Sequence, residues 1–148
     1  MIKKSVFLIF CLLLALHASA LDAGFVAGSI SQPASFFFGL SAGMGLFVPM
    51  LKFEFEGYKL KESELNSLSA AAKFQPKFGR FAPYIFLGAG SEFTKLNFHF
   101  SEYHFYTMTG GGLHIFFSSM FSLRFDLRFL HFSDSDRARV SGGIFIHL

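Results

Sequence analysis

The nine residues Phe121-Ser122-Leu123-Arg124-Phe125-Asp126-Leu127-Arg128-Phe129 alternate strictly between apolar and polar side chains. Every odd position is Phe or Leu, and Ser, Arg or Asp stands between them. Successive side chains of a β-strand point to opposite faces, so this period of two places the charges on one face and the apolar side chains on the other. An amphipathic helix would instead need a period of 3.6 residues. The segment is therefore predicted to be a strand with one charged face and one strongly apolar face.

The same alternation recurs elsewhere, for example from Leu51, where Lys52, Glu54 and Glu56 alternate with Phe and Leu. Seven breaks rich in Pro, Ser, Asp or charged residues interrupt the pattern. Eight strands are therefore predicted, at residues 22–31, 36–47, 50–60, 65–75, 82–94, 103–117, 121–133 and 137–148. The first is the hardest to read, because it is rich in small residues and alternates poorly.

The first 20 residues have the composition of a secretory signal peptide. Lys3 and Lys4 precede an apolar stretch, and Ala18-Ser19-Ala20 offers the small residues of a cleavage site after Ala20. We expect residues 1–20 to be a signal peptide and residues 21–148 to be one domain. The only cysteine, Cys11, lies in the leader, so no disulfide is expected. Without the leader, 11 Lys and Arg face 10 Asp and Glu, which gives no reason to expect nucleic-acid binding.

The predicted polar faces carry charges of both signs, and the opposite faces are nearly continuous Phe, Leu, Ile, Ala and Met. This pattern predicts an all-β, eight-stranded, antiparallel up-and-down transmembrane barrel whose apolar face meets lipid. Its lumen would be filled by side chains, not open as a wide pore. The predicted lumen charge network consists of Lys52, Glu54, Glu56, Lys73, Glu92, Arg124, Asp126, Arg128 and Arg139.

A soluble barrel is the alternative, because alternation alone does not say which face points inward. A lipocalin-like periplasmic lipid carrier would place the Phe side chains inside and the charges outside. The tyrosines Tyr58, Tyr84, Tyr103 and Tyr106 are expected in the aromatic girdles at the two membrane interfaces. No cofactor and no metal site are expected, since no His pair has ligand spacing.

The chain resembles the small outer-membrane β-barrel domain family of the OmpA and OmpX type. The residues that carry the resemblance are 82–90, 110–114 and 123–129, together with the C-terminal octapeptide. That octapeptide is similar to the β-signal of such proteins, with its assembly positions at Ser141, Gly143, Ile146 and Leu148. The resemblance implies a monomer in the cell outer membrane, in contact with outer-membrane lipids and lipopolysaccharide. Its other implied partners are periplasmic chaperones and the outer-membrane assembly machinery.

Family members of this kind mostly have structural or surface roles, so such a role is the expectation here, with no enzymatic activity. The alternative is a lipid A deacylase-like acyl hydrolase. His131 and Ser133 stand two residues apart, as in the His-x-Ser of outer-membrane lipid A deacylases, and a hydroxyl beside an imidazole is a possible nucleophile. The Glu that completes that family's site is missing, because no Glu follows Glu102. Asp134 and Asp136 are the candidates to replace it.

Deletion of residues 146–148 is expected to abolish insertion into the outer membrane, because it removes the apolar end of the β-signal. The amount of the truncated protein in purified outer membranes measures the effect. Wild-type levels of the truncated protein there would refute the assignment of the β-signal.

Overall fold

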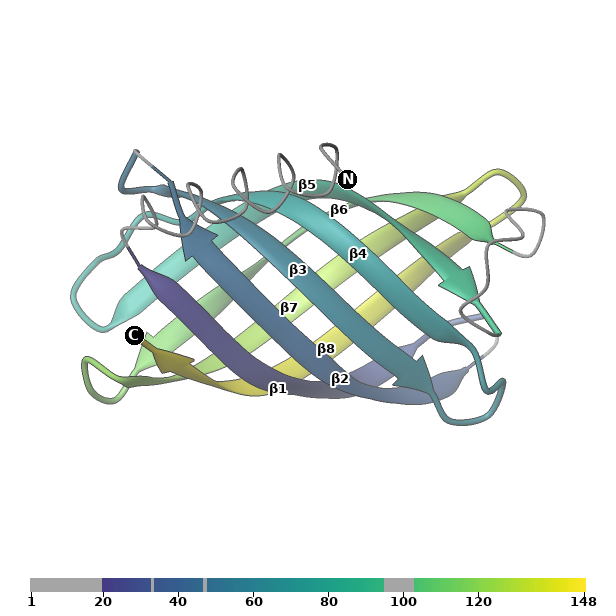
Figure 1. Cartoon of the computed structure of the whole chain (residues 1–148), viewed down its shortest axis with the longest axis horizontal. Coiled ribbons are helices and arrows are strands. Elements are labelled where there is room, and N and C mark those ends of the chain that lie inside the picture. The colour runs from purple at the N-terminus through teal and green to yellow at the C-terminus, as the bar shows by residue number, and fades with distance from the viewer. Residues whose placement is uncertain (1–19, 33, 47, 95–102) are drawn as a thin grey trace, which may run out of the picture.

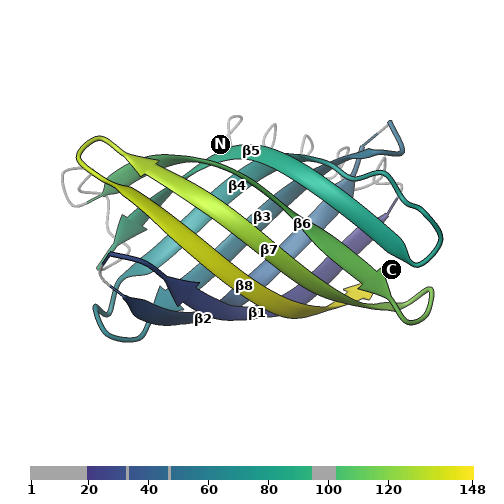
Figure 2. The same cartoon turned by 180° about the vertical axis from the view of Figure 1, so that it is seen from behind.

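A computed structural model describes residues 20–32, 34–46, 48–94 and 103–148, and these form a closed barrel of eight antiparallel strands (Figures 1 and 2). The predicted fold class is confirmed, and no strand boundary differs from its prediction by more than two residues. The strands are β1 (Leu21–Ile30), β2 (Ser35–Gly45), β3 (Leu51–Leu60), β4 (Asn66–Phe74), β5 (Phe81–Phe93), β6 (His104–Phe116), β7 (Phe121–Phe132) and β8 (Asp136–His147).

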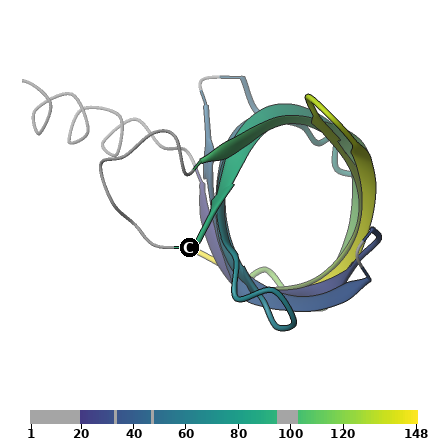
Figure 3. The same ribbon diagram turned by 90° about the vertical axis from the view of Figure 1, so that its right-hand side faces the viewer.

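Each strand pairs with its neighbours in sequence, and β1 pairs with β8 to close the ring (Figure 3). This last pairing runs from Asp22 opposite His147 to Ile30 opposite Arg139. Closure leaves no unpaired strand edge, which is the condition for crossing a lipid bilayer with strands. The end at which β1 begins and β8 ends is called the terminal end below, and the opposite end is called the far end.

No helix in the four described ranges has the length and apolar character needed to cross a membrane.

The interior of the barrel holds the charged side chains together with a cluster of apolar ones, and its outer wall is apolar. Along β7, Arg124 and Arg128 have no exposed surface, whereas Phe125 is 53% exposed. The same holds on β3, where Glu54 is buried and Phe55 is exposed. This is the reverse of the arrangement that a soluble lipid carrier requires, and it is the one that a bilayer favours.

The structure corrects the prediction for three of the four tyrosines. Tyr58, Tyr84 and Tyr106 do not form girdles but lie inside the barrel, each less than 5% exposed. Tyr84 lies across from Gly112, where an added Cβ would come within 2.5 Å of the tyrosine oxygen. Tyr106 lies across from Gly90 in the same way. Glycine on the facing strand gives each ring the room that a narrow barrel otherwise lacks.

At the far end, Glu62 ties the loop after β3 to the start of β2. Its carboxylate accepts hydrogen bonds from the Ser35 hydroxyl and, at 2.9 Å, from the Phe36 backbone N–H. The backbone N–H of Lys61 also donates to the Phe36 carbonyl, at 2.8 Å. The bond from Ser35 contributes most to lowering the pKa of Glu62 below its usual value. The far end of the barrel is therefore held by side-chain as well as backbone contacts.

Candidate functional site: the ion cluster of the lumen

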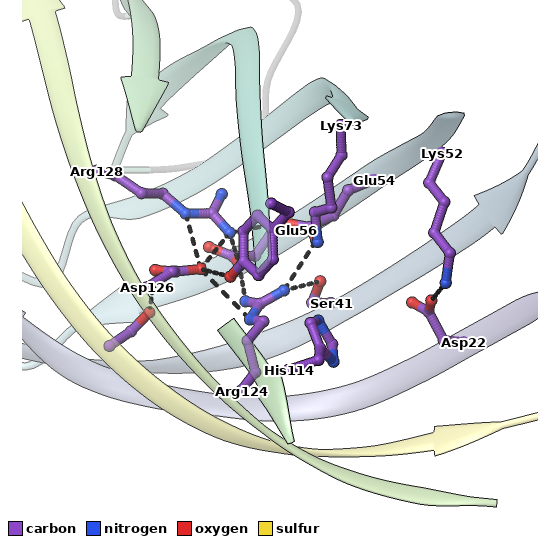
Figure 4. A network of polar contacts seen from close by, with 12 residues as sticks. Asp22, Ser41, Lys52, Glu54, Glu56, Lys73, His114, Arg124, Asp126 and Arg128 are labelled. Atoms are coloured by element: carbon purple, nitrogen blue, oxygen red, sulfur yellow. Dashed lines mark hydrogen bonds and ion pairs between the residues drawn. The ribbon is translucent and has the colours of Figure 1, made fainter. Parts of the chain in front are cut away.

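The structure places all nine residues of the predicted lumen network inside the barrel. Eight are buried, and only Lys52 is half-buried. Seven of the nine form one connected cluster in the lumen, drawn from β3, β4, β7 and β8, and Figure 4 labels all of them except Arg139. These seven, called the lumen cluster below, are Glu54, Glu56, Lys73, Arg124, Asp126, Arg128 and Arg139.

Glu54 accepts hydrogen bonds from more cations than either other acid of the lumen cluster. One carboxylate oxygen accepts hydrogen bonds from Lys73 and, at 2.8 Å, from Arg124 Nη1. The other oxygen accepts from Arg128 Nη2 at 2.6 Å. Three cations from β4 and β7 thus meet one carboxylate from β3, and the barrel is braced across its lumen.

The other two acids extend the lumen cluster to β8. Glu56 accepts from Arg124 Nη2 at 2.7 Å and from Arg139 Nη1. Asp126 accepts from Arg128 Nη2 at 2.8 Å and from the Ser141 hydroxyl at 2.6 Å. Buried charges are tolerated when they are paired and hydrogen-bonded, and these carboxylates meet that condition.

Aromatic rings cover the cations from the side. The guanidinium carbon of Arg124 lies 4.4 Å from the centre of the Phe145 ring, and that of Arg128 lies 4.7 Å from the Phe86 ring. Each is within the range of a cation–π interaction. The lumen is therefore packed by the arginine stems and by inward-facing aromatic side chains.

Two further ion pairs stand apart from the lumen cluster, one toward each end. Lys52 Nζ lies 2.7 Å from Asp22 Oδ2 at the terminal end. Arg137 Nη1 lies 3.0 Å from Glu92 Oε2 at the far end. Asp22 and Arg137 were not predicted as lumen residues, although Arg137 shares the face of Arg139. The sequence does not indicate Asp22 as a lumen residue because β1 alternates weakly, and it does not indicate Arg137 because this residue lies at the end of its strand.

The residues of the predicted acyl-hydrolase site lie at the far end. His131 is exposed on the outer face of β7, and Ser133 is exposed just beyond that strand. No hydrogen bond joins these two residues in the part of the chain that the structure describes. Instead, His131 Nδ1 lies 2.9 Å from Oδ1 of Asp136, its partner across the β7–β8 pair. Of the two candidate carboxylates, Asp134 and Asp136, it is Asp136 that contacts His131.

The predicted assembly positions all lie on β8 or directly after it. Ser141 is buried and bonds Asp126, while Ile146 and Leu148 are exposed on the outer wall. At Gly143 an added Cβ would come within 2.5 Å of the Phe25 carbonyl oxygen, so the position has no room for a side chain. The role of these residues as an assembly signal stays a prediction. So does the leader, since Ala18 lies outside the described residues and Ala20 is their first member.

Within the described ranges, no group of three or more His, Cys, Asp or Glu side chains is placed to hold a metal ion.

No protein-family model and no curated protein sequence matches the chain. Several solved structures match the chain in fold. The N-terminal β-barrel domain of Pseudomonas aeruginosa OprF superposes with a TM-score of 0.75 at 13% identity, over 88% of this chain and 98% of that one. A de novo designed transmembrane β-barrel gives 0.67 at 18%, over 88% and 97%. The outer-membrane enzyme PagL gives 0.51 at 13%, over 86% and 98%. The chain thus has the fold of the small outer-membrane barrels, as its sequence predicted, and fold alone does not give function.

Glu54→Gln is expected to destabilise the folded barrel by roughly 3–5 kcal/mol, because it takes the charged partner from the buried Lys73 and one carboxylate from each of Arg124 and Arg128. Glu64→Gln is the matched control, an identical change at an exposed position, and should stay within about 0.5 kcal/mol of the wild type. The measurement is urea unfolding in lipid vesicles, followed by gel mobility without boiling. Equal unfolding midpoints for the two variants would show that the lumen cluster does not stabilise the barrel.

Proposed function

We propose that the chain is an exported, integral protein of the cell outer membrane with a structural or surface role, and that it is not a wide pore. The observation that carries this proposal is the filling of the lumen. The largest side chains without appreciable exposure are Arg124, Arg128 and Arg139, and all three point into the barrel. An interior filled by paired charges holds the barrel rigid and leaves its apolar wall and its loops as the surfaces for interaction.

The proposed orientation places the terminal end in the periplasm and the far end outside the cell. The apolar wall would contact outer-membrane lipids and lipopolysaccharide, and the chain would act as a monomer. Ile146 and Leu148 are exposed on the wall, where the assembly machinery could read them after periplasmic chaperones deliver the unfolded chain. The support for this route is the position of the β-signal-like residues on the closing strand β8.

Liposomes that contain the purified protein are expected to exclude a small sugar as well as protein-free liposomes do, because paired side chains fill the lumen. Swelling at a rate proportional to the amount of protein would contradict a sealed barrel.

A strain without the protein is expected to become more sensitive to detergent, and the Glu54→Gln variant should restore resistance less well than Glu64→Gln. Unchanged sensitivity in the deletion strain would refute the structural role.

A second candidate is hydrolysis of ester-linked acyl chains at the outer leaflet, and the 2.9 Å contact of His131 with Asp136 favours it. A carboxylate on Nδ1 fixes the imidazole tautomer and leaves Nε2 as a base. In this mechanism Nε2 takes the proton of the Ser133 hydroxyl, and the serine oxygen attacks the ester carbonyl. The alcohol leaves with that proton, and water then releases the fatty acid from the serine.

A groove on the outer wall offers room for an acyl chain, and Ala89 on its edge lies two strands away from His131. It has a volume of about 930 Å³, and its lining includes Ala23, Ala42, Ala70 and Ala89. Ala89 is paired with Thr107, and Thr107 is paired with His131. The row of small outward side chains therefore leads across the sheet toward the imidazole.

If this second candidate is right, Ser133→Ala abolishes loss of acyl chains from lipid A, and Asp136→Asn lowers the rate by up to about 10⁴-fold, as for other serine hydrolases that lose the carboxylate. His104→Ala, at an exposed His of the same end, is the control and should have no effect. Mass spectrometry of lipid A gives the readout. An acylation pattern that is the same with Ser133→Ala as with the wild type would exclude catalysis here.

A further inference from the structure

At the terminal end, the lumen opens into a cavity of about 310 Å³, called the vestibule below. Its walls include Lys52, Gln75, Lys77, Phe116 and His147, which come from three strands and one turn. It is separate from His131, which lies at the far end. No step of the proposed functions uses it.

A chain of polar contacts runs along the inner side of the vestibule. The Ser122 hydroxyl lies 2.7 Å from His147 Nε2 and 3.0 Å from His114 Nδ1. His147 Nδ1 lies 4.0 Å from Asp22 Oδ2, which is too far for a hydrogen bond. Ser122 has no exposed surface, so a substrate has no access to its hydroxyl. The three residue types of a hydrolytic triad are present, but the arrangement is suited to binding and not to catalysis.

The vestibule carries an excess of positive charge. Lys52 is neutralised by Asp22 at 2.7 Å. The Lys77 ammonium stands 4.1 Å from the centre of the Phe116 ring, and within the described residues it makes no ion pair. An exposed ammonium held over an aromatic ring at the mouth of a cavity is a donor that suits an anion.

A buried amide oxygen adds a second, independent feature. Gln75 is 6% exposed and lines the vestibule, yet its Oε1 has no hydrogen-bond partner among the described residues. Most buried polar atoms in folded proteins have a partner, and an unpaired one costs free energy. This oxygen accepts hydrogen bonds, so a ligand that fits the vestibule needs a donor as well as a negative charge.

We propose that the vestibule binds a small phosphate monoester that also carries a hydroxyl group. The phosphate oxygens accept hydrogen bonds from Lys77, and the hydroxyl of the ligand donates to Gln75 Oε1. The cavity volume corresponds to about ten water molecules at ~30 Å³ each, which suits a ligand of the size of glycerol 3-phosphate.

The test is calorimetric titration of the folded protein with glycerol 3-phosphate, in a detergent that has no phosphate group. Saturable binding is expected, and Lys77→Met should weaken it by roughly tenfold or more, because a charge-assisted hydrogen bond is lost. Lys61→Met, at an exposed lysine of the far end, is the matched control and should leave the affinity unchanged. Gel mobility without boiling verifies that each variant is folded.

Inorganic phosphate is the second probe, because it lacks the alcohol hydroxyl and so tests the phosphate contact without the contact to Gln75. Gln75→Leu should weaken binding of glycerol 3-phosphate and leave binding of phosphate unchanged. Absence of saturable binding to the wild type, or equal affinity of the Lys77→Met and Lys61→Met variants, would overturn the proposal. Equal loss of both probes in Gln75→Leu would overturn the assigned hydroxyl contact. The proposed structural and hydrolase functions do not depend on these outcomes.

Discussion

The bonds between Glu54 and its three cations are the contacts on which the rest of the barrel depends. An apolar wall can meet lipid only if the polar half of every strand is satisfied inside. Because Arg124 and Arg128 are wholly buried, their charges have to be neutralised within the lumen, and carboxylates from β3 do this. The same bonds connect opposite sides of the ring, so one set of contacts pairs the buried charges and braces the barrel across its lumen.

Much of this fold is readable from the period of two, because the two faces of each strand meet such different surroundings. The alternation places Glu54 and Arg124 on the polar faces of their strands, although it does not by itself say that those faces point inward. The predicted side-chain positions are wrong or incomplete where the alternation is weak or where residue type was used in its place. Tyr58 shares the face of Glu54, yet its residue type suggested a girdle, while Asp22 was hidden among the small residues of β1.

The register between strands and the contacts around the mouth of the barrel are beyond prediction from the sequence, and these decide the candidate sites. The sequence offered two acids for His131, and only the β7–β8 register selects Asp136. The vestibule is a stronger case, since Gln75 and Lys77 belong to a turn and carry no motif. They form a candidate site only because the closed barrel brings them to the same cavity as His147. The proposed hydrolase site and the vestibule therefore both lie where strands end, and the period of two does not describe those positions.

The most direct test of a polar interior inside a lipid-facing wall is a spin-label scan of β5 in lipid bilayers. Ile85 and Leu87 point outward and are 66% and 64% exposed, while Tyr84 and Phe86 point inward and are buried. Labels at Ile85 and Leu87 should collide freely with oxygen and hardly at all with a water-soluble nickel complex. Labels at Tyr84 and Phe86 should show low collision rates with oxygen. Strong collision of the outward labels with the nickel complex would contradict the account, because the wall would then face water.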